Sequence, residues 1–132
     1  MPFDTHLTSD YMGTILVGTG VVTGSEILQA CKSVTLLVQS TANFHYKLID
    51  LARVTELRIT PKEYDDILEQ DRLIAKQRPN DLVAIVATDE SVRAIMEEWR
   101  HRVEELGWAV EILPSRDEAM AWIQDRVEGA QV

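Results

Sequence analysis

The sequence predicts an α/β sandwich in which about four helices pack on a mostly parallel sheet of four to five strands. Four segments open with a helix-start signal, and short apolar runs lie between them. Inside the helical segments, apolar residues recur at three- and four-residue steps. Strands that alternate with helices favour parallel pairing, because each helix carries the chain back across the sheet.

The N-terminal part is expected to hold two strands and one helix. Phe3 to Leu7 and Thr14 to Val17 are the candidate strands, and no helix fits between them, so their pairing is expected to be antiparallel. Thr23-Gly24-Ser25-Glu26 is a capping box, in which the Thr hydroxyl and the Glu carboxylate satisfy free backbone N–H groups. Ile27, Cys31 and Val34 form the apolar stripe of the helix that follows.

In the middle of the chain, the apolar run Tyr46 to Leu51 is expected to form a central strand followed by a short loop. Thr60-Pro61-Lys62-Glu63 is a second capping box, with Pro at the first helical position, where its missing N–H is not needed. This helix is expected to end at Pro79. Its apolar stripe is interrupted by Asp71, and Leu73 points elsewhere.

The C-terminal part alternates in the same way. Asp81 to Ala87 is a continuous apolar run, typical of a strand covered on both faces. A helix with one apolar stripe follows from about Asp89 to Leu106. Trp108 to Leu113, interrupted by Glu111, is expected to be an edge strand. Ser115-Arg116-Asp117-Glu118 is a third capping box and begins the last helix.

Length and charge narrow the function classes. The chain has 132 residues, which suits a single domain spanning 1–132. A net charge of −9 argues against nucleic-acid binding, which depends on Lys and Arg at phosphates. No apolar run is long enough for membrane insertion, and no signal peptide is recognisable. One cysteine excludes an intrachain disulfide, so we expect a cytoplasmic protein.

The glycine-containing segment Gly18 to Gly24 suggests a nucleotide site, because it follows a strand and opens a helix, with Asp50 at the end of the next strand. Its spacing departs from the dinucleotide fingerprint, since the third glycine comes four residues after the second. Val21 and Val22 favour either a continuing strand or a turn between strand and helix, with Gly18 and Gly20 at a bulge or bend. Nucleotide binding is therefore a minor alternative.

No catalytic or metal-binding pattern is present in the sequence. His6, His45 and His101 are far apart and lack the spacing of metal ligands, so surface positions are expected. Cys31 has no neighbouring cysteine and is expected to be a small core residue. The adjacent acids on the helices point in different directions and do not share a site. We therefore expect a protein that is not an enzyme and has no cofactor.

The order of elements resembles the STAS family, the fold of the stage II sporulation anti-sigma-factor antagonist, which is related to the lipid-binding CRAL-TRIO lobe. The resemblance covers about residues 11–127. It rests on Gly20 to Glu26, on Tyr46 to Leu51, on Leu82 to Val86, and on Ser115 to Ile123 with its Glu-Ala and Trp-aliphatic pairs. It implies a stand-alone bacterial regulatory module that binds proteins and has no enzymatic activity.

The resemblance also identifies a departure. Signalling members carry Asp-Ser-Ser/Thr-Gly after the central strand, and a partner kinase phosphorylates that Ser. Here Arg58-Ile59-Thr60-Pro61 stands in its place, so the acceptor Ser is absent and Thr60 is the residual hydroxyl. Because Thr60 is also the predicted helix cap, a phosphorylation switch of the usual kind is not expected.

Three functions remain open: a protein-binding regulatory module, a carrier of a small apolar or acyl ligand, and a nucleotide-binding domain. Ligand sites of α/β sheets lie at the carboxyl ends of the strands. This rule predicts that Thr19, Asp50, Arg53, Thr88 and Asp89 form the ligand-binding site. The interrupted stripe around Asp71 and the stray Leu73 favour two interpretations of the helix after Thr60. It either meets a second copy in a homodimer or is a loosely packed surface helix with one stray Leu.

Overall fold

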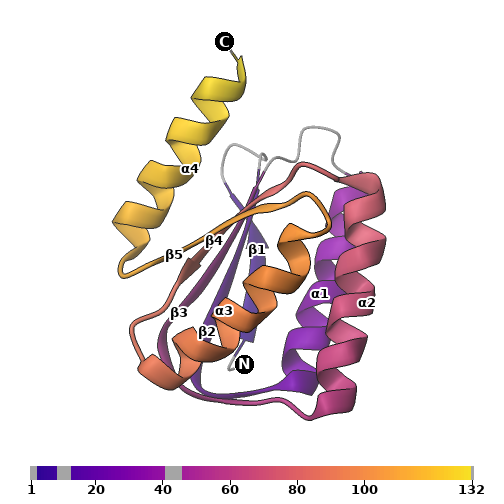
Figure 1. Ribbon diagram of the computed structural model, residues 1–132, viewed down its shortest axis with the longest axis vertical. Helices are drawn as coiled ribbons and strands as arrows, with labels where there is room; N and C mark the ends of the chain where they lie inside the picture. Colours follow the sequence, from indigo (N-terminus) through magenta and orange to yellow (C-terminus); the bar gives the residue numbers. More distant parts are fainter. Residues whose placement is uncertain (1–2, 9–12, 41–45, 132) are drawn as a thin grey trace.

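The computed structural model describes residues 3–8, 13–40 and 46–131 of the chain. They form five strands, β1 (Phe3–Leu7), β2 (Gly13–Thr23), β3 (Tyr46–Arg58), β4 (Leu82–Val86) and β5 (Ala109–Leu113). Four helices accompany them, α1 (Gly24–Ser40), α2 (Pro61–Gln77), α3 (Glu90–Glu104) and α4 (Arg116–Gln131). The predicted order of strands and helices is confirmed (Figure 1).

The strands form one sheet in the order β1-β2-β3-β4-β5. β1 pairs antiparallel with β2, as predicted, and every other neighbouring pair is parallel. β5 is an edge strand, which confirms that prediction. Helices α1, α2 and α3 cover one face of the sheet and α4 covers the other (Figure 1).

The two sheet faces carry separate apolar cores. The larger core joins the sheet to α1, α2 and α3 and contains Val34, Ile74 and Val103. The smaller core joins Tyr46 and other strand residues to α4. Side chains alternate between the faces of a strand. Lys47 therefore points toward the larger core while its neighbour Tyr46 packs with α4.

The helix caps form as the sequence predicts. The Thr60 hydroxyl accepts from the Glu63 N–H, and the Glu63 carboxylate accepts from the Thr60 N–H, which completes the capping box of α2. The Thr23–Glu26 box has the same two contacts. In the Ser115 box, the Ser hydroxyl accepts from the Glu118 N–H at 3.2 Å.

Two strands are longer than the sequence suggests. β3 continues past Leu51 to Arg58, and β2 continues past Val17 to Thr23, so the expected loop after Leu51 is wrong. The two strands pair across register shifts between Val17 and Thr19 and between Gly20 and Val21. Gly20 has a φ of 65°, which glycine adopts without strain. Gly18 to Thr23 is thus a bulged strand rather than a phosphate-binding loop, in agreement with the bulge interpretation.

Candidate functional site

A polar pocket of about 370 Å³ lies along the middle of β2 and β3, level with the carboxyl end of β4, where Val86 pairs with Asp50. It is lined by Val17, Gly18, Thr19, Asp50, Ala52, Arg53 and Arg116. Arg116 donates to Asp50 Oδ2 from Nε at 3.0 Å and from Nη2 at 2.8 Å. The other carboxylate oxygen accepts from the Ala52 N–H at 3.0 Å. Asp50 is therefore held at both oxygens.

Three of the five predicted ligand residues meet in this pocket, namely Thr19, Asp50 and Arg53. Thr88 follows β4, whose Val86 pairs with Asp50, so it lies at the same end of the sheet but does not line the pocket. Asp89 caps α3, and its pKa is lowered, first by the Ser91 hydroxyl and then by the Val92 N–H. Arg116 is an additional lining residue; it follows the predicted cap Ser115.

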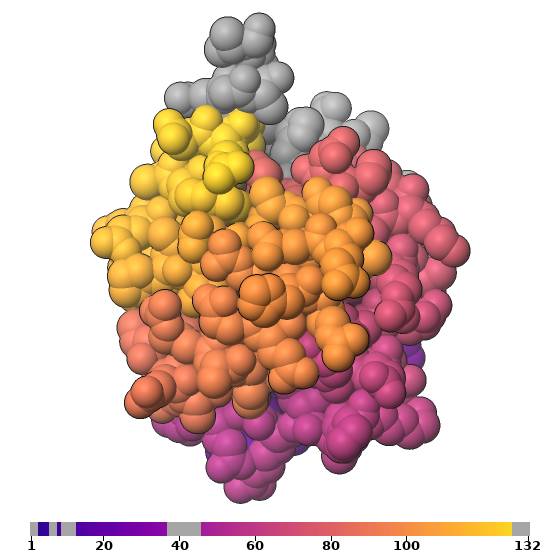
Figure 2. Space-filling view, in the orientation of Figure 1, coloured from indigo at the N-terminus to yellow at the C-terminus, as the bar shows by residue number. Residues whose placement is uncertain are grey.

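A second depression lies where β3 passes into α2, beside α3. This groove of about 350 Å³ is lined by Leu57, Ile59, Thr60, Pro61, Tyr64, Asp65, Leu68, Ile95, Glu98 and Arg102. Thr60 is thus exposed at the groove while its hydroxyl caps α2. Figure 2 shows α3 (orange) lying across the middle of this face, between α4 (yellow) and α2 (rose).

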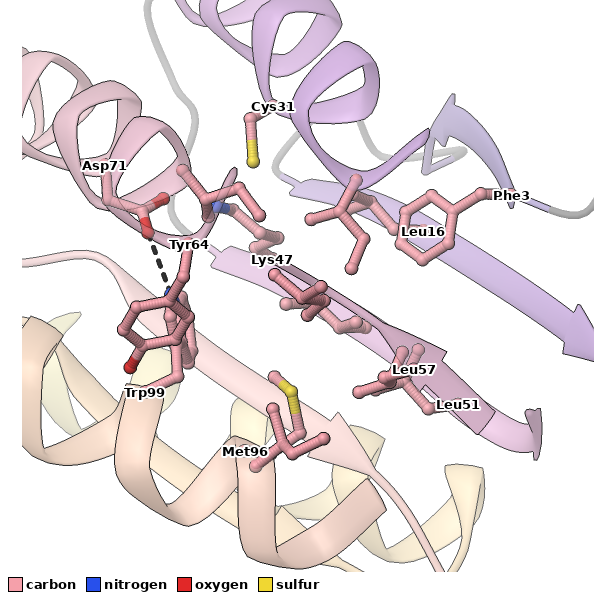
Figure 3. A pocket seen from close by; sticks show the side chains of 15 residues that line it. Phe3, Leu16, Cys31, Lys47, Leu51, Leu57, Tyr64, Asp71, Met96 and Trp99 are labelled. Atoms are coloured by element: carbon pink, nitrogen blue, oxygen red, sulfur yellow. Dashed lines mark hydrogen bonds between the residues drawn. The ribbon is translucent and has the colours of Figure 1, made fainter. Parts of the chain in front are cut away.

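An internal cavity of about 60 Å³ lies between the sheet and helices α1, α2 and α3 (Figure 3). Its lining consists of Phe3, Leu16, Ile27, Cys31, Lys47, Ile49, Leu51, Leu57, Ile59, Tyr64, Ile67, Asp71, Ile95, Met96 and Trp99. Leu57, Ile59, Tyr64 and Ile95 line the groove as well, so the groove and the cavity meet there. A buried water needs on the order of 10–15 Å³. The cavity therefore has room for a few waters or a short aliphatic chain.

One end of the cavity is charged. Asp71 is 1% exposed and Lys47 is 3% exposed, although both types are normally found at the surface. Trp99 donates from Nε1 to Asp71 Oδ2 at 2.8 Å, and the Lys47 ammonium lies 4.9 Å from the centre of the Trp108 ring. Figure 3 shows Asp71 and Lys47 at one end of the lining and Phe3 at the other.

The electrostatics of this end follow from burial. Burial raises the pKa of Asp71 to about 6, while Lys47, the Trp99 hydrogen bond and Arg72 act in the opposite direction. Asp71 is therefore mostly ionised at neutral pH. Its second oxygen, Oδ1, is buried and has no hydrogen-bond partner. Tyr64 Oη is also buried without a partner, so two orphaned polar atoms belong to residues that line the cavity.

The position of Asp71 overturns one sequence-based interpretation. The interrupted stripe of α2 was expected to be partly exposed at a dimer contact, but Asp71 lies in the larger core between Ile67 and Ile74. Leu73 is 40% exposed, as expected. A buried carboxylate is tolerated here because Trp99 and Lys47 stabilise it. The break in the stripe is therefore explained within one copy of the chain.

Cys31 and the described carboxylates and histidines do not add a reactive thiol or a metal site. Burial raises the pKa of Cys31 to about 12, with Asp71 adding to the effect, so the thiol stays protonated and behaves as a core residue. No cluster of three or more His, Cys, Asp or Glu residues that could hold a metal ion occurs in the described ranges. His101 is exposed, whereas the side chains of His6 and His45 lie outside the described residues.

Lys47 and Asp71 were missed as site residues, although each left a signal. Lys47 interrupts an apolar run at a position that faces the same side as Ile49 and Leu51. Asp71 falls on the helical stripe, four residues after Ile67 and three before Ile74. Two opposite charges at inward positions of separate elements indicate a buried pair, but sequence cannot place them side by side.

Solved structures of known proteins share this fold. One is an uncharacterised protein of the DUF3478 family with a SpoIIAA-like fold from Shewanella loihica, at 19% identity and a TM-score of 0.55, with 92% of this chain and 91% of that chain covered. Another is the anti-sigma factor antagonist SpoIIAA in its unphosphorylated form, at 11% identity and a TM-score of 0.59, with 96% and 98% covered. The chain has a STAS-like fold.

A third structure, the Bacillus cell fate determinant SpoIIAA in its phosphorylated form, is similar at 12% identity and a TM-score of 0.59, with 95% of this chain and 98% of that one covered. No model of a known protein family matches the sequence. No curated protein matches it either. Among the described residues, no helix has the length and apolar character that a membrane span requires.

Proposed function

We propose that this chain is a non-enzymatic binding module that holds a small, mainly apolar molecule in the cavity between the sheet and helices α1, α2 and α3. The observation that carries the proposal is a buried carboxylate oxygen without a partner in a chamber whose lining, apart from Asp71, Lys47 and Tyr64, is apolar. An orphaned charged oxygen costs free energy, and a bound molecule with a donor would remove that cost. The groove beside Thr60 supplies the entrance.

Xenon tests whether the cavity accepts an apolar guest, because it enters dry apolar cavities. The chain is labelled at its Ile and Met methyl groups, and spectra are recorded under increasing xenon pressure. We expect the signals of Ile49, Ile67 and Met96 to shift and saturate. Ile123, which lies in the smaller core under α4, serves as the internal control. Equal, unsaturating shifts at Ile123 and Ile67 would contradict the proposal.

The second candidate is a regulatory module that works through protein contacts, as the name of the anti-sigma factor antagonist states for that protein. Two exposed apolar side chains on neighbouring helices favour it, Leu36 on α1 at 68% and Leu73 on α2 at 40%. In this proposal the chain is a bacterial, cytoplasmic protein that forms a homodimer. Thr60, engaged as a helix cap, does not serve as a phosphoacceptor.

The polar pocket with Thr19, Asp50 and Arg53 remains part of the same proposal as a contact site level with the carboxyl end of β4. Its Asp50–Arg116 pair fixes one wall, and Arg53 is exposed beside it. A carboxylate of a partner protein would form an ion pair with Arg53 at this pocket. A pull-down with the native chain tests this site. We expect the partner to be lost with Arg53→Glu and retained with Arg58→Glu, the matched exposed control.

A further inference from the structure

The charged end of the cavity restricts which molecule fits it. Asp71 Oδ2 is occupied by the Trp99 indole N–H at 2.8 Å, and Oδ1 is buried with no partner. A carboxylate oxygen accepts hydrogen bonds and cannot donate them when ionised. The group that meets Oδ1 must therefore be a hydrogen-bond donor.

Net charge narrows the choice further. Asp71 contributes one negative charge to the chamber and Lys47 one positive charge, and both are almost fully buried. Arg72, the next cation along α2, is exposed and paired with Glu69. A carboxylate or an ammonium group on the guest would leave an uncompensated buried charge, which is costly in a low-dielectric interior. An uncharged donor leaves the charges balanced.

The route into the cavity fixes the orientation of the guest. Groove and cavity meet at Tyr64, and Asp71 lies seven residues further along α2, about 10 Å at ~1.5 Å per residue. Between them the walls are apolar, with Ile67 on α2 and Met96 on α3. A guest that reaches Asp71 therefore brings its polar group in first and leaves an apolar portion among these side chains.

We propose that the cavity selects a small, uncharged apolar molecule that ends in a hydroxyl group, which donates to Asp71 Oδ1 beside Lys47. This inference rests on the proposed function, since it names the chemical class of the molecule that the cavity holds. It excludes fatty acids and alkylamines as preferred ligands. The apolar portion contacts Ile67 and Met96, and Trp99 holds the carboxylate in place.

Isomeric probes test the inference. The native chain is titrated with 1-butanol, with its isomer methyl propyl ether, and with butyrate and butylamine, and the Trp99 indole N–H signal is followed by NMR. Because a hydrogen bond to a charged group is lost with the ether, we expect 1-butanol to bind at least about tenfold more tightly than methyl propyl ether. Butyrate and butylamine are expected to bind more weakly than the alcohol.

Two variants assign the preference to the carboxylate. Asp71→Asn retains an acceptor for Trp99 but turns an N–H₂ group toward the guest, so the alcohol-to-ether ratio should fall to near one. Asp66→Asn, an exposed change on the same helix, should leave the ratio unchanged. Equal binding of alcohol and ether to the native chain would overturn the inference and leave the proposed function standing. Absence of any saturable shift, as expected if only water fills the cavity, would overturn both.

Discussion

Trp99 and Asp71 join α3 to α2 through one buried hydrogen bond, in which the indole N–H donates to Oδ2 at 2.8 Å across 28 residues of sequence. The same carboxylate lies in the field of Lys47 on the central strand β3. Three elements therefore meet at one ionisable group. Its protonation state affects the stability of the fold and the character of the cavity.

The first prediction concerns pH. Burial raises the pKa of Asp71 from 3.8 to about 6, so between these values the unfolded chain releases a proton that the folded chain keeps. The stabilising contribution of protonated Asp71 is full below pH 3.8 and is lost as the pH rises through about 6. Relative to Asp71→Asn, wild type should lose roughly 2–3 kcal/mol between pH 4 and pH 8. Urea unfolding of both proteins across this range measures it. A constant difference would show that Asp71 titrates normally.

The second prediction concerns the coupling of Lys47 and Asp71. Lys47→Met removes the buried cation and should cost about 3–5 kcal/mol at pH 7.5, because the Asp71 charge is left uncompensated. In the Asp71→Asn background the same change should cost at least about 1 kcal/mol less, since no anion remains. A double-mutant cycle by urea unfolding measures the difference. Additive effects of the two substitutions would mean that these charges do not interact.

The third prediction compares two glycines with positive φ. Gly20, at 65°, has open space where a Cβ would stand, so Gly20→Ala should cost only about 1–2 kcal/mol of backbone strain. Gly107, at 98°, would place a Cβ 2.5 Å from the Pro79 carbonyl oxygen. Gly107→Ala should therefore cost clearly more, about 2–4 kcal/mol. Thermal unfolding of both variants beside wild type ranks them, and equal losses would contradict the steric argument.

The fourth prediction concerns association. Leu73 is 40% exposed on α2, and we expect it to contact a second copy. Leu73→Glu should then shift the chain toward monomer at micromolar concentration, because two carboxylates would meet across a two-fold axis. Sedimentation velocity of wild type and Leu73→Glu measures this, with Gln124→Glu, an exposed position on α4 across the sheet, as the control. A monomeric wild type, or a dimer that Leu73→Glu does not dissociate, would contradict this prediction.

Local signals in the sequence were sufficient for most of the architecture. The capping boxes at Thr23 and Thr60 were predictable because each involves residues three apart, and the apolar runs located all five strands. The second half of β3 was missed for a physical reason. Its residues after Leu51 are buried at every third position, at Val54 and Leu57, because register shifts break the normal alternation.

The candidate site was less predictable, since it depends on contacts between distant elements. The rule that α/β sheets bind ligands at strand carboxyl ends grouped Thr19, Asp50 and Arg53, which do line one pocket. It could not predict Arg116, which lies 66 residues beyond its partner Asp50 in the sequence. The carrier alternative called for an internal cavity, but the sequence could not predict its position or its lining. The volume of the cavity depends on how closely α1, α2 and α3 pack on the sheet. The periodicity of apolar residues does not predict how closely they pack.

The long pairing of β2 with β3 has a consequence for motion. β1 pairs with β2 only up to Gly18, and β4 pairs with β3 only up to Asp50. Thr19–Thr23 and Arg53–Arg58 therefore form a two-stranded extension of the sheet, and such ribbons are marginal by themselves. Backbone amides of the extension should exchange with deuterium sooner than those of Leu48 or Ile85. Leu57, at the mouth of the cavity, belongs to this extension. The entrance thus lies on the part of the sheet that we expect to open first.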